Sequence, residues 1–314
     1  MCLPYFNAKI LLFGEYGVMF NSKGLIFPYN SFRGQLLFSC ESEMTSSIKQ
    51  SNYILRRLVQ FIQVNNFDSL PYFKFDIDQL KYEVEKNLYF RSNIPQGYGV
   101  GSSGAIVAAL FDRYTSVKYK KSNLSQVQLE ALKEILSDLE LMFHGKSSGF
   151  DPLTSYLNKP ILVNNSLPEI CSIDYYSKRR KPFVFLVDTN ISRQSDLIIK
   201  KVLNLLKRDS FKERFVKEML VYNSLCIDSY LDNNQSVFYD AIGKLSEFQL
   251  KYLSESIPDN ILSFWRNGLE LGMSYLKLCG AGGGGYLIGF CRNYSDVLIL
   301  AEKYQTNLIR LNLN

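Results

Sequence analysis

The stretch PQGYGVGSSGAIVAAL (residues 95–110) places glycines and serines directly before an apolar run. Its small and hydroxyl residues are Gly97, Gly99, Gly101, Ser102, Ser103 and Gly104. Glycines let backbone N–H groups converge on phosphate oxygens, and a helix that begins near Ser103 directs the positive end of its dipole at the same anion. The stretch therefore predicts an anion-binding loop, with these six residues as nucleotide contacts.

The loop lacks the features of three common nucleotide-binding motifs. A Rossmann loop is followed about 20 residues later by an acidic residue, whereas KYKKSNLS (118–125) is basic. A Walker A loop ends in GK[ST], whereas this one ends in SSGA. The HRD and DFG elements of protein kinases do not occur. A structural glycine turn stays open for the motif alone. A nucleotide would need a cation from elsewhere in the chain.

Composition restricts the class of protein. The chain has 314 residues, 46% of them apolar, which predicts a folded protein of two domains. We expect no membrane span, because there is no apolar run of about 18 residues. The net charge of +6 is mild, so we expect no nucleic-acid partner and favour an anionic substrate. Six cysteines without CxxC spacing indicate a reducing, cytoplasmic location. His144 is the only histidine, which excludes a His-rich metal site.

Apolar periodicity predicts strands mixed with helices. Strand patterns occupy 9–14, 35–40, 72–77, 87–94, 183–189, 284–291 and 306–314, and helix patterns occupy 47–66, 103–114, 125–143, 194–208, 211–231, 240–256 and 295–304. A polar, proline-interrupted break near 164–182 divides the chain. We predict an α+β protein with one domain at 1–170 and another at 171–314.

Two further stretches complete a pattern. AKILLFGEYGVMF (8–20) places Lys9 at the head of a strand, and CGAGGGGYLIGF (279–290) is a second glycine-rich loop before a strand. In order, the segments 8–20, 95–107 and 277–288 resemble the three motifs of the GHMP kinases, the family of galacto-, homoserine, mevalonate and phosphomevalonate kinases. The resemblance implies a ribosomal-protein-S5-like N-terminal lobe, a ferredoxin-like C-terminal lobe and an active site between them.

The resemblance also implies roles for single residues. ELMFHGKSSGFDP (140–152) is similar to the mevalonate kinase segment that carries the general base. By this similarity Asp151 is the base, Lys9 is its catalytic partner, and Ser103 and Glu140 bind Mg²⁺, with ATP as phosphate donor. Taken alone, Asp151 is commonly a helix N-cap, Glu140 a solvated helix residue and Lys9 a strand-end charge.

The resemblance does not single out one substrate. Substrate contacts are expected at Glu15, Tyr16, Arg193, Ser195, Gly280, Ala281 and Gly282. The base segment and Arg193, which could clamp a carboxylate, favour the 5-hydroxyl of mevalonate in isoprenoid synthesis. GEYG at 14–17 and GSSG at 101–104 resemble bacterial phosphomevalonate kinases instead. Phosphomevalonate or another metabolite is the alternative acceptor, and a catalytically silent ligand-binding protein is the alternative class. A monomer and a homodimer both stay open.

Overall fold

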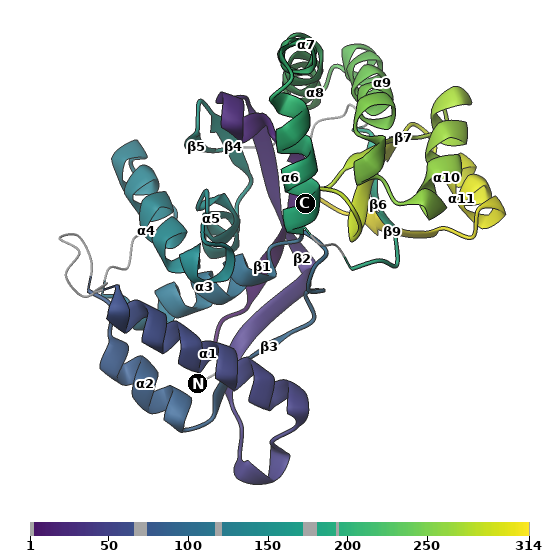
Figure 1. Ribbon diagram of the computed structural model, residues 1–314. Helices are drawn as coiled ribbons and strands as arrows, with labels where there is room; N and C mark the ends of the chain where they lie inside the picture. Colours follow the sequence, from purple (N-terminus) through teal and green to yellow (C-terminus); the bar gives the residue numbers. More distant parts are fainter. Residues whose placement is uncertain (1–2, 66–73, 117–120, 172–180, 193–194, 314) are drawn as a thin grey trace.

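Two antiparallel sheets organise the protein, and helices pack around each of them (Figure 1). The computed structural model describes residues 3–65, 74–116, 121–171, 181–192 and 195–313. None of the helices in these ranges is both long and apolar enough to cross a membrane. The predicted α+β class is confirmed.

The first sheet is built from the N-terminal half of the chain. Its strands are β1 (Phe6–Phe13), β2 (Gly24–Phe38), β3 (Leu88–Ser92), β4 (Ile161–Asn164) and β5 (Leu167–Ile170). Their order is β1-β2-β4-β5, and β3 also pairs with β2. The 15-residue strand β2 pairs with β4 near its start and with β3 near its end. This length lets one strand connect three others.

Helices from the same half pack on this sheet and on one another. They are α1 (Ser46–Val64), α2 (Ile77–Glu85), α3 (Ser102–Tyr114), α4 (Gln126–His144) and α5 (Phe150–Leu157). Both α3 and α5 contact β1 and β2, and α4 contacts α3 and α5. Because α3 lies between the sheet and other helices, its run AIVAAL is almost entirely buried. The start of α3 is thereby fixed in place.

The second sheet has the predicted ferredoxin-like topology. Its strands are β6 (Phe183–Asp188), β7 (Tyr275–Leu278), β8 (Tyr286–Cys291) and β9 (Asn307–Leu311), in the order β7-β8-β6-β9. Helices follow β6 and separate β8 from β9, which gives a β-α-β-β-α-β succession. These helices are α6 (Ser195–Leu206), α7 (Asp209–Arg214), α8 (Leu220–Leu231), α9 (Gln235–Tyr252), α10 (Asp259–Glu270) and α11 (Tyr294–Lys303).

The two sheets share one hydrophobic core. The ring of Phe13, at the end of β1, stacks on Phe290 of β8 with centroids 5.3 Å apart. Phe238 of α9 contacts both rings edge-on. Since Phe13 and Phe290 are fully buried, this contact holds the end of β1 against the second sheet.

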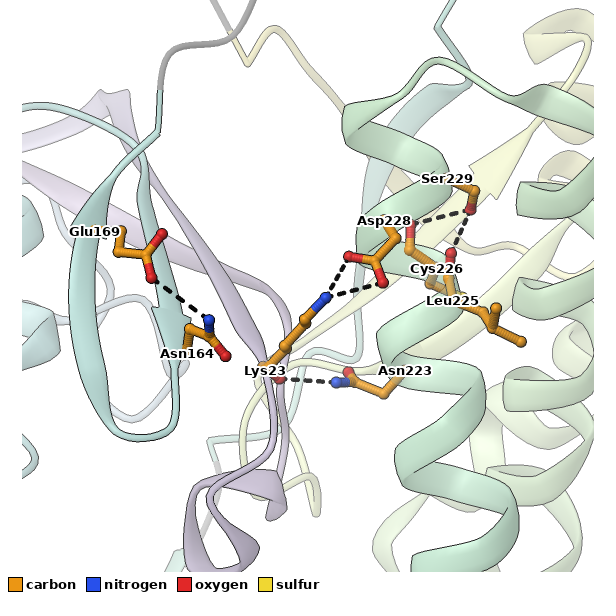
Figure 2. A network of polar contacts seen from close by, with 8 residues as sticks. All are labelled: Lys23, Asn164, Glu169, Asn223, Leu225, Cys226, Asp228 and Ser229. Carbon is orange, nitrogen blue, oxygen red and sulfur yellow. Dashed lines mark hydrogen bonds and ion pairs between the residues drawn. The ribbon is translucent and has the colours of Figure 1, made fainter.

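A polar contact also joins the two halves of the chain (Figure 2). The ammonium of Lys23, just before β2, lies 2.6 and 2.9 Å from the two carboxylate oxygens of Asp228 on α8. The amide of Asn223, one helical turn earlier, donates to the backbone carbonyl of Lys23 at 2.8 Å. Helix α8 also packs on β1 and β2. The boundary at 170/171 stays a prediction.

Most predicted elements are present, and one is wrong. Within 72–77, Phe75 makes an isolated bridge to Thr115, and helix α2 begins at Ile77. The side chain of Asp76 accepts a hydrogen bond from the amide of Gln79, which caps the helix. The aromatic run therefore supplies a buried anchor, Phe75, rather than a strand. The pattern missed α2, α10, β4, β5, β7 and the first half of β2.

Candidate active site

The glycine loop at 97–101 ends at the first turn of α3. Gly97, Gly99 and Gly101 all have φ between 75° and 80°, a left-handed conformation that side chains disfavour. Gly101 is the N-cap residue, and helix α3 begins at Ser102. The loop thus leads into the N-terminus of a helix, where backbone amides and the helix dipole favour an anion.

Lys9 and Asp151 meet beside this loop. The Lys9 ammonium lies 2.9 Å from an Asp151 carboxylate oxygen. Lys9 is 8% exposed, whereas Asp151 is 32% exposed, so the carboxylate faces solvent while its partner is covered. The Lys9 amide donates to the carbonyl of Val100, and a Cβ on Gly101 would lie 2.7 Å from Lys9 Cγ. The cation that the glycine loop lacks is therefore supplied by β1.

The local fold of α5 presents Asp151 in its first helical turn. Gly149 is the N-cap, so Asp151 is not the cap residue that its sequence context alone suggests. Gly104 of α3 packs against the backbone at this point: a Cβ there would lie 2.8 Å from the carbonyl carbon of Asp151 and from the nitrogen of Pro152. The two helix starts consequently approach each other backbone to backbone.

Glu140, buried on α4, faces the start of α3. Ser103 donates a hydrogen bond to one Glu140 oxygen at 2.8 Å, and Ser147 donates to the other at 2.6 Å. Burial and, to a smaller extent, the charge of Asp151 raise the pKa of the Glu140 carboxyl to about 7, against the opposing effects of the two hydroxyls and Lys9. A 4% exposed carboxylate with two hydroxyl donors is not the solvated helix residue that its position suggests.

The first and third motifs contact each other directly. Lys277 on β7 forms a buried ion pair with Glu15, and the Tyr16 hydroxyl donates to the carbonyl of Ala281 at 2.7 Å. Gly280 and Gly282, on either side of Ala281, have φ of 77° and 78°. In this structure the predicted substrate contacts Glu15 and Tyr16 therefore bind strand β7 and the glycine loop that follows it, respectively.

The second and third motifs also touch. A Cβ on Gly285 would lie 2.7 Å from the Cα of Tyr98, so only glycine allows this approach. The Tyr98 and Tyr286 rings are 4.9 Å apart. Burial and the nearby Asp188 carboxylate raise the pKa of the Tyr98 hydroxyl. All three motifs, far apart in the sequence, thus converge at the junction of the two sheets.

A cavity of about 410 Å³ adjoins the glycine loop. Its wall includes Gln96, Ser102 and Ile106 from the loop and α3, with further side chains from α1 and β3. A cavity of about 590 Å³ around Asp76 and Arg113 includes no residue of the three motifs. We therefore consider the smaller cavity as the ligand site, because it adjoins the helix start.

Some predicted residues cannot be placed. Arg193 lies outside the described residues. The same holds for residues 178–180 of the basic run KRRK (178–181). Ser195 begins α6, but its side chain and that of His144 are outside what the structure describes. The predicted carboxylate clamp at Arg193 and Ser195 consequently stays a prediction.

Two contacts at the site were not predicted. Lys277 precedes the second glycine-rich loop. Its charge within the apolar run YLKL (275–278) was the sequence feature that could have indicated a buried ion pair. Ser147 lies in the segment that carries the base, and its hydroxyl binds both the Glu140 carboxylate and the amide of Gly149. Their roles depend on partners remote in sequence or on loop geometry.

Part of the chain matches a known protein family. Residues 69–159 match the family model of the GHMP kinases N terminal domain, a range that includes the first glycine loop, Glu140 and Asp151. No curated protein sequence matches the chain.

Solved structures match over nearly the whole chain. L. major mevalonate kinase in complex with R-mevalonate is 15% identical, covers 99% of this chain and 95% of its own, and has a TM-score of 0.65. Methanococcus jannaschii mevalonate kinase is 18% identical, with coverage of 100% and 98% and a TM-score of 0.64.

A third structure is Streptococcus pneumoniae phosphomevalonate kinase in complex with phosphomevalonate and AMPPNP. It is 14% identical, with coverage of 99% and 100% and a TM-score of 0.63. At these identities the likeness shows the fold. Residues 69–159 of this protein are a GHMP kinase N-terminal domain, and the chain as a whole has the GHMP kinase fold.

Proposed function

We propose that the protein is an ATP- and Mg²⁺-dependent kinase that phosphorylates the 5-hydroxyl of mevalonate in isoprenoid synthesis. The observation that carries this proposal is the Lys9–Asp151 pair, at 2.9 Å, beside the buried Ser103–Glu140 pair at the start of α3. A ligand-binding protein without catalysis has little use for a solvent-facing carboxylate held by a buried lysine next to an anion site.

The glycine loop and the first turn of α3 would hold the nucleotide phosphates. Their amides and the helix dipole favour negative charge, and Lys9 adds a full positive charge. The adjoining cavity of about 410 Å³ is large enough for a nucleoside, since ligand sites start at about 300 Å³. AMPPNP in the phosphomevalonate kinase of this fold supports ATP as the donor.

Ser103 and Glu140 fit a magnesium ion. One carboxylate and one hydroxyl, completed by phosphate oxygens and water, form the usual Mg²⁺ environment in kinases. Among the described residues no three His, Cys, Asp or Glu side chains gather, so an all-protein metal cage is not available there. Bound Mg²⁺ would neutralise charge on the transferred phosphoryl group.

The acceptor hydroxyl is activated by this chain's own side chains. Asp151 accepts the proton of the hydroxyl as the oxygen attacks the terminal phosphorus of ATP, and ADP leaves with the bridging oxygen. Lys9 holds the Asp151 carboxylate in one orientation through the ion pair. Catalysis then consists mainly of positioning and charge neutralisation, as in other phosphoryl transfers.

Mevalonate is favoured over phosphomevalonate by the segment around the base and by Arg193. The L. major enzyme of this fold binds R-mevalonate, which supports that choice. Phosphomevalonate is the second candidate, because GEYG and GSSG resemble bacterial phosphomevalonate kinases and one of them shares the fold. The two acceptors differ in one anionic group, for which the sequence offers a further cation at Lys146 or in the basic run at Lys178–Lys181.

The test is a coupled assay of ADP release over mevalonate, phosphomevalonate, homoserine and galactose. Arg193→Ala should raise the KM for mevalonate about 10–100-fold, in line with about 1.5–3 kcal/mol for a hydrogen bond to a charged group. The KM for ATP should stay the same.

Two outcomes contradict the proposal. If phosphomevalonate is the better acceptor and Lys146→Ala impairs its use at least as much as Arg193→Ala, the acceptor is phosphomevalonate. If none of the acceptors releases ADP from ATP above the rate of the Asp151→Asn variant, the protein is not a kinase of this group.

A further inference from the structure

Lys277 and Glu15 form an ion pair that is shielded from solvent and joins the two sheets. Lys277 lies on β7 and is 0% exposed, and Glu15 lies in the turn after β1 and is 3% exposed. The Lys277 ammonium donates to one Glu15 oxygen and also, at 2.7 Å, to the carbonyl of Leu278. Burial raises the pKa of Glu15, and the charge of Lys277 opposes that rise.

The next residue makes a second connection to the same loop. Tyr16 donates its hydroxyl hydrogen to the carbonyl of Ala281, four residues after Lys277. Its φ of 57° is left-handed, which is uncommon for an aromatic residue and costs free energy. Glu15 and Tyr16 therefore hold the stretch from Lys277 to Ala281 at both ends.

A buried ion pair of this kind is weak as a stabilising device. Removing two charges from water costs several kcal/mol per ion, and apolar replacement of a buried pair is often neutral or favourable. One Glu15 oxygen, moreover, has no hydrogen-bond partner among the described residues. Stability alone thus gives little reason for charges at these positions.

The pair extends a series of alternating charges toward the catalytic residues. Lys9 is close enough to Glu15 for its charge to favour the ionised Glu15 carboxylate. Lys9 in turn pairs with Asp151. Along this series the charges are those of Lys277, Glu15, Lys9 and Asp151, positive and negative in turn.

We infer that Lys277 is a positioning residue, which acts through Glu15 to fix the second glycine-rich loop, at 279–285, relative to Lys9 and Asp151. The loop at 280–282 carries the predicted acceptor contacts, so this role rests on the proposed function. Glu15 is then a partner of Lys277 rather than a direct substrate contact. The pair lies on the acceptor side of the site, so its loss should change the use of the acceptor more than the binding of the nucleotide.

The experiment compares two double variants. Glu15→Gln with Lys277→Met removes the pair and leaves no unpaired charge, which favours folding. Glu83→Gln with Arg113→Met is the matched control, because it removes another mostly buried pair that lies within the first half of the chain. In the first variant, kcat should fall or the KM for the acceptor should rise by about 10–100-fold, the scale expected when a reacting group is misplaced by about 1 Å. Its KM for ATP should change less than about twofold, and the control should keep wild-type kinetics.

Hydrogen exchange of the ligand-free proteins gives a readout independent of activity. Exchange at 279–285 should accelerate in the Glu15/Lys277 variant and stay at the wild-type rate in the control. The inference would be overturned if both double variants changed the exchange of the loop equally. It would also be overturned if the Glu15/Lys277 variant showed wild-type kinetics and wild-type exchange. If the wild type phosphorylates no acceptor, the proposed function fails, and the exchange comparison still decides whether the pair positions the loop.

Discussion

Asp151 has the partner and the exposure that a general base requires. It is paired with the covered ammonium of Lys9 yet remains open to an acceptor. We predict that Asp151→Asn lowers kcat by about 10²–10⁴-fold, the usual contribution of a general base, and leaves ATP affinity nearly the same. Steady-state kinetics and nucleotide titration measure both effects. Asp112→Asn is the control, since Asp112 also pairs with a lysine and is similarly exposed. Near-normal turnover of Asp151→Asn would remove this residue from the mechanism.

If Glu140 binds Mg²⁺ as proposed, we predict that the magnesium requirement depends on pH. Its pKa of about 7 means that a proton competes with the metal as the pH falls below neutral. The Mg²⁺ concentration for half-maximal activity should therefore rise between pH 8 and pH 6, by up to about tenfold per pH unit below the pKa. Glu140→Gln should need more Mg²⁺ at every pH and lose this dependence, because a neutral amide is a weaker ligand for a hard cation.

Magnesium titrations at several pH values test this prediction. Glu134→Gln serves as the control on the same helix, because Glu134 is 68% exposed and pairs only with its neighbour Lys133 among the contacts seen here. If Glu140→Gln and wild type give the same titrations, Glu140 is not a metal ligand.

At the scale of elements, the start of α3 depends on the absence of a side chain at Gly104. An alanine Cβ there would meet the backbone of Asp151 and Pro152 at 2.8 Å, and backbone cannot move aside as a flexible side chain can. Alanine should gain about 1 kcal/mol of helix propensity over glycine. The displacement of α5 nevertheless dominates. We predict that Gly104→Ala lowers kcat about 100-fold, as expected when a catalytic group moves by about 1 Å.

The matched control is Gly243→Ala on α9. A Cβ there would make only ordinary contacts, the nearest at 3.5 Å to the ring of Tyr275. This variant should keep full activity and gain stability through its helix propensity. Kinetic assays and thermal unfolding of both variants separate the two effects. Wild-type activity in Gly104→Ala would show that the approach of α3 to α5 is not required.

The sequence pattern correctly predicted those elements that are determined by residues adjacent to them in the sequence. Helix α4 begins after Ser125, whose side chain and that of Gln128 form a reciprocal cap, as the sequence indicates. Strand β7 was missed because Lys277 interrupts its apolar run, and the partner that permits burial of that charge is Glu15, 262 residues earlier. Likewise, residues 72–77 were read as a strand because of their aromatic run, and α2, which begins after its cap Asp76, was missed.

In the candidate site, too, local features were predicted from the sequence and long-range contacts were not. The glycine loop was predicted from its own residues, because left-handed glycines before a helix are a local feature. The roles of Lys9, Glu140 and Asp151 came from family resemblance, since their ordinary readings were a strand end, a solvated face and a helix cap. Burial and contacts across the fold give them their environment, and no local pattern contains that information.

At the scale of the whole molecule, two contacts of unequal strength connect α8 to the first sheet (Figure 2). The Lys23–Asp228 pair has side chains 33% and 48% exposed, and exposed pairs contribute only about 0–1 kcal/mol. Asn223 is 3% exposed, and its amide binds the carbonyl of Lys23. Removing the buried Asn223 amide leaves this partly buried carbonyl without its donor, and an unsatisfied buried group costs about 1–3 kcal/mol. The uncharged contact should therefore contribute more to holding the halves together.

We accordingly predict that Asn223→Ala lowers the free energy of unfolding by about 1–3 kcal/mol, while Lys23→Met lowers it by less than about 1 kcal/mol. The helix propensity of alanine offsets at most about 0.7 kcal/mol of the first loss. Urea denaturation at low and high salt measures both variants. Because salt screens exposed charges, it should shrink the small effect of Lys23→Met and leave that of Asn223→Ala unchanged. A larger loss for Lys23→Met than for Asn223→Ala would mean that the ion pair, and not the buried amide, joins α8 to the first sheet.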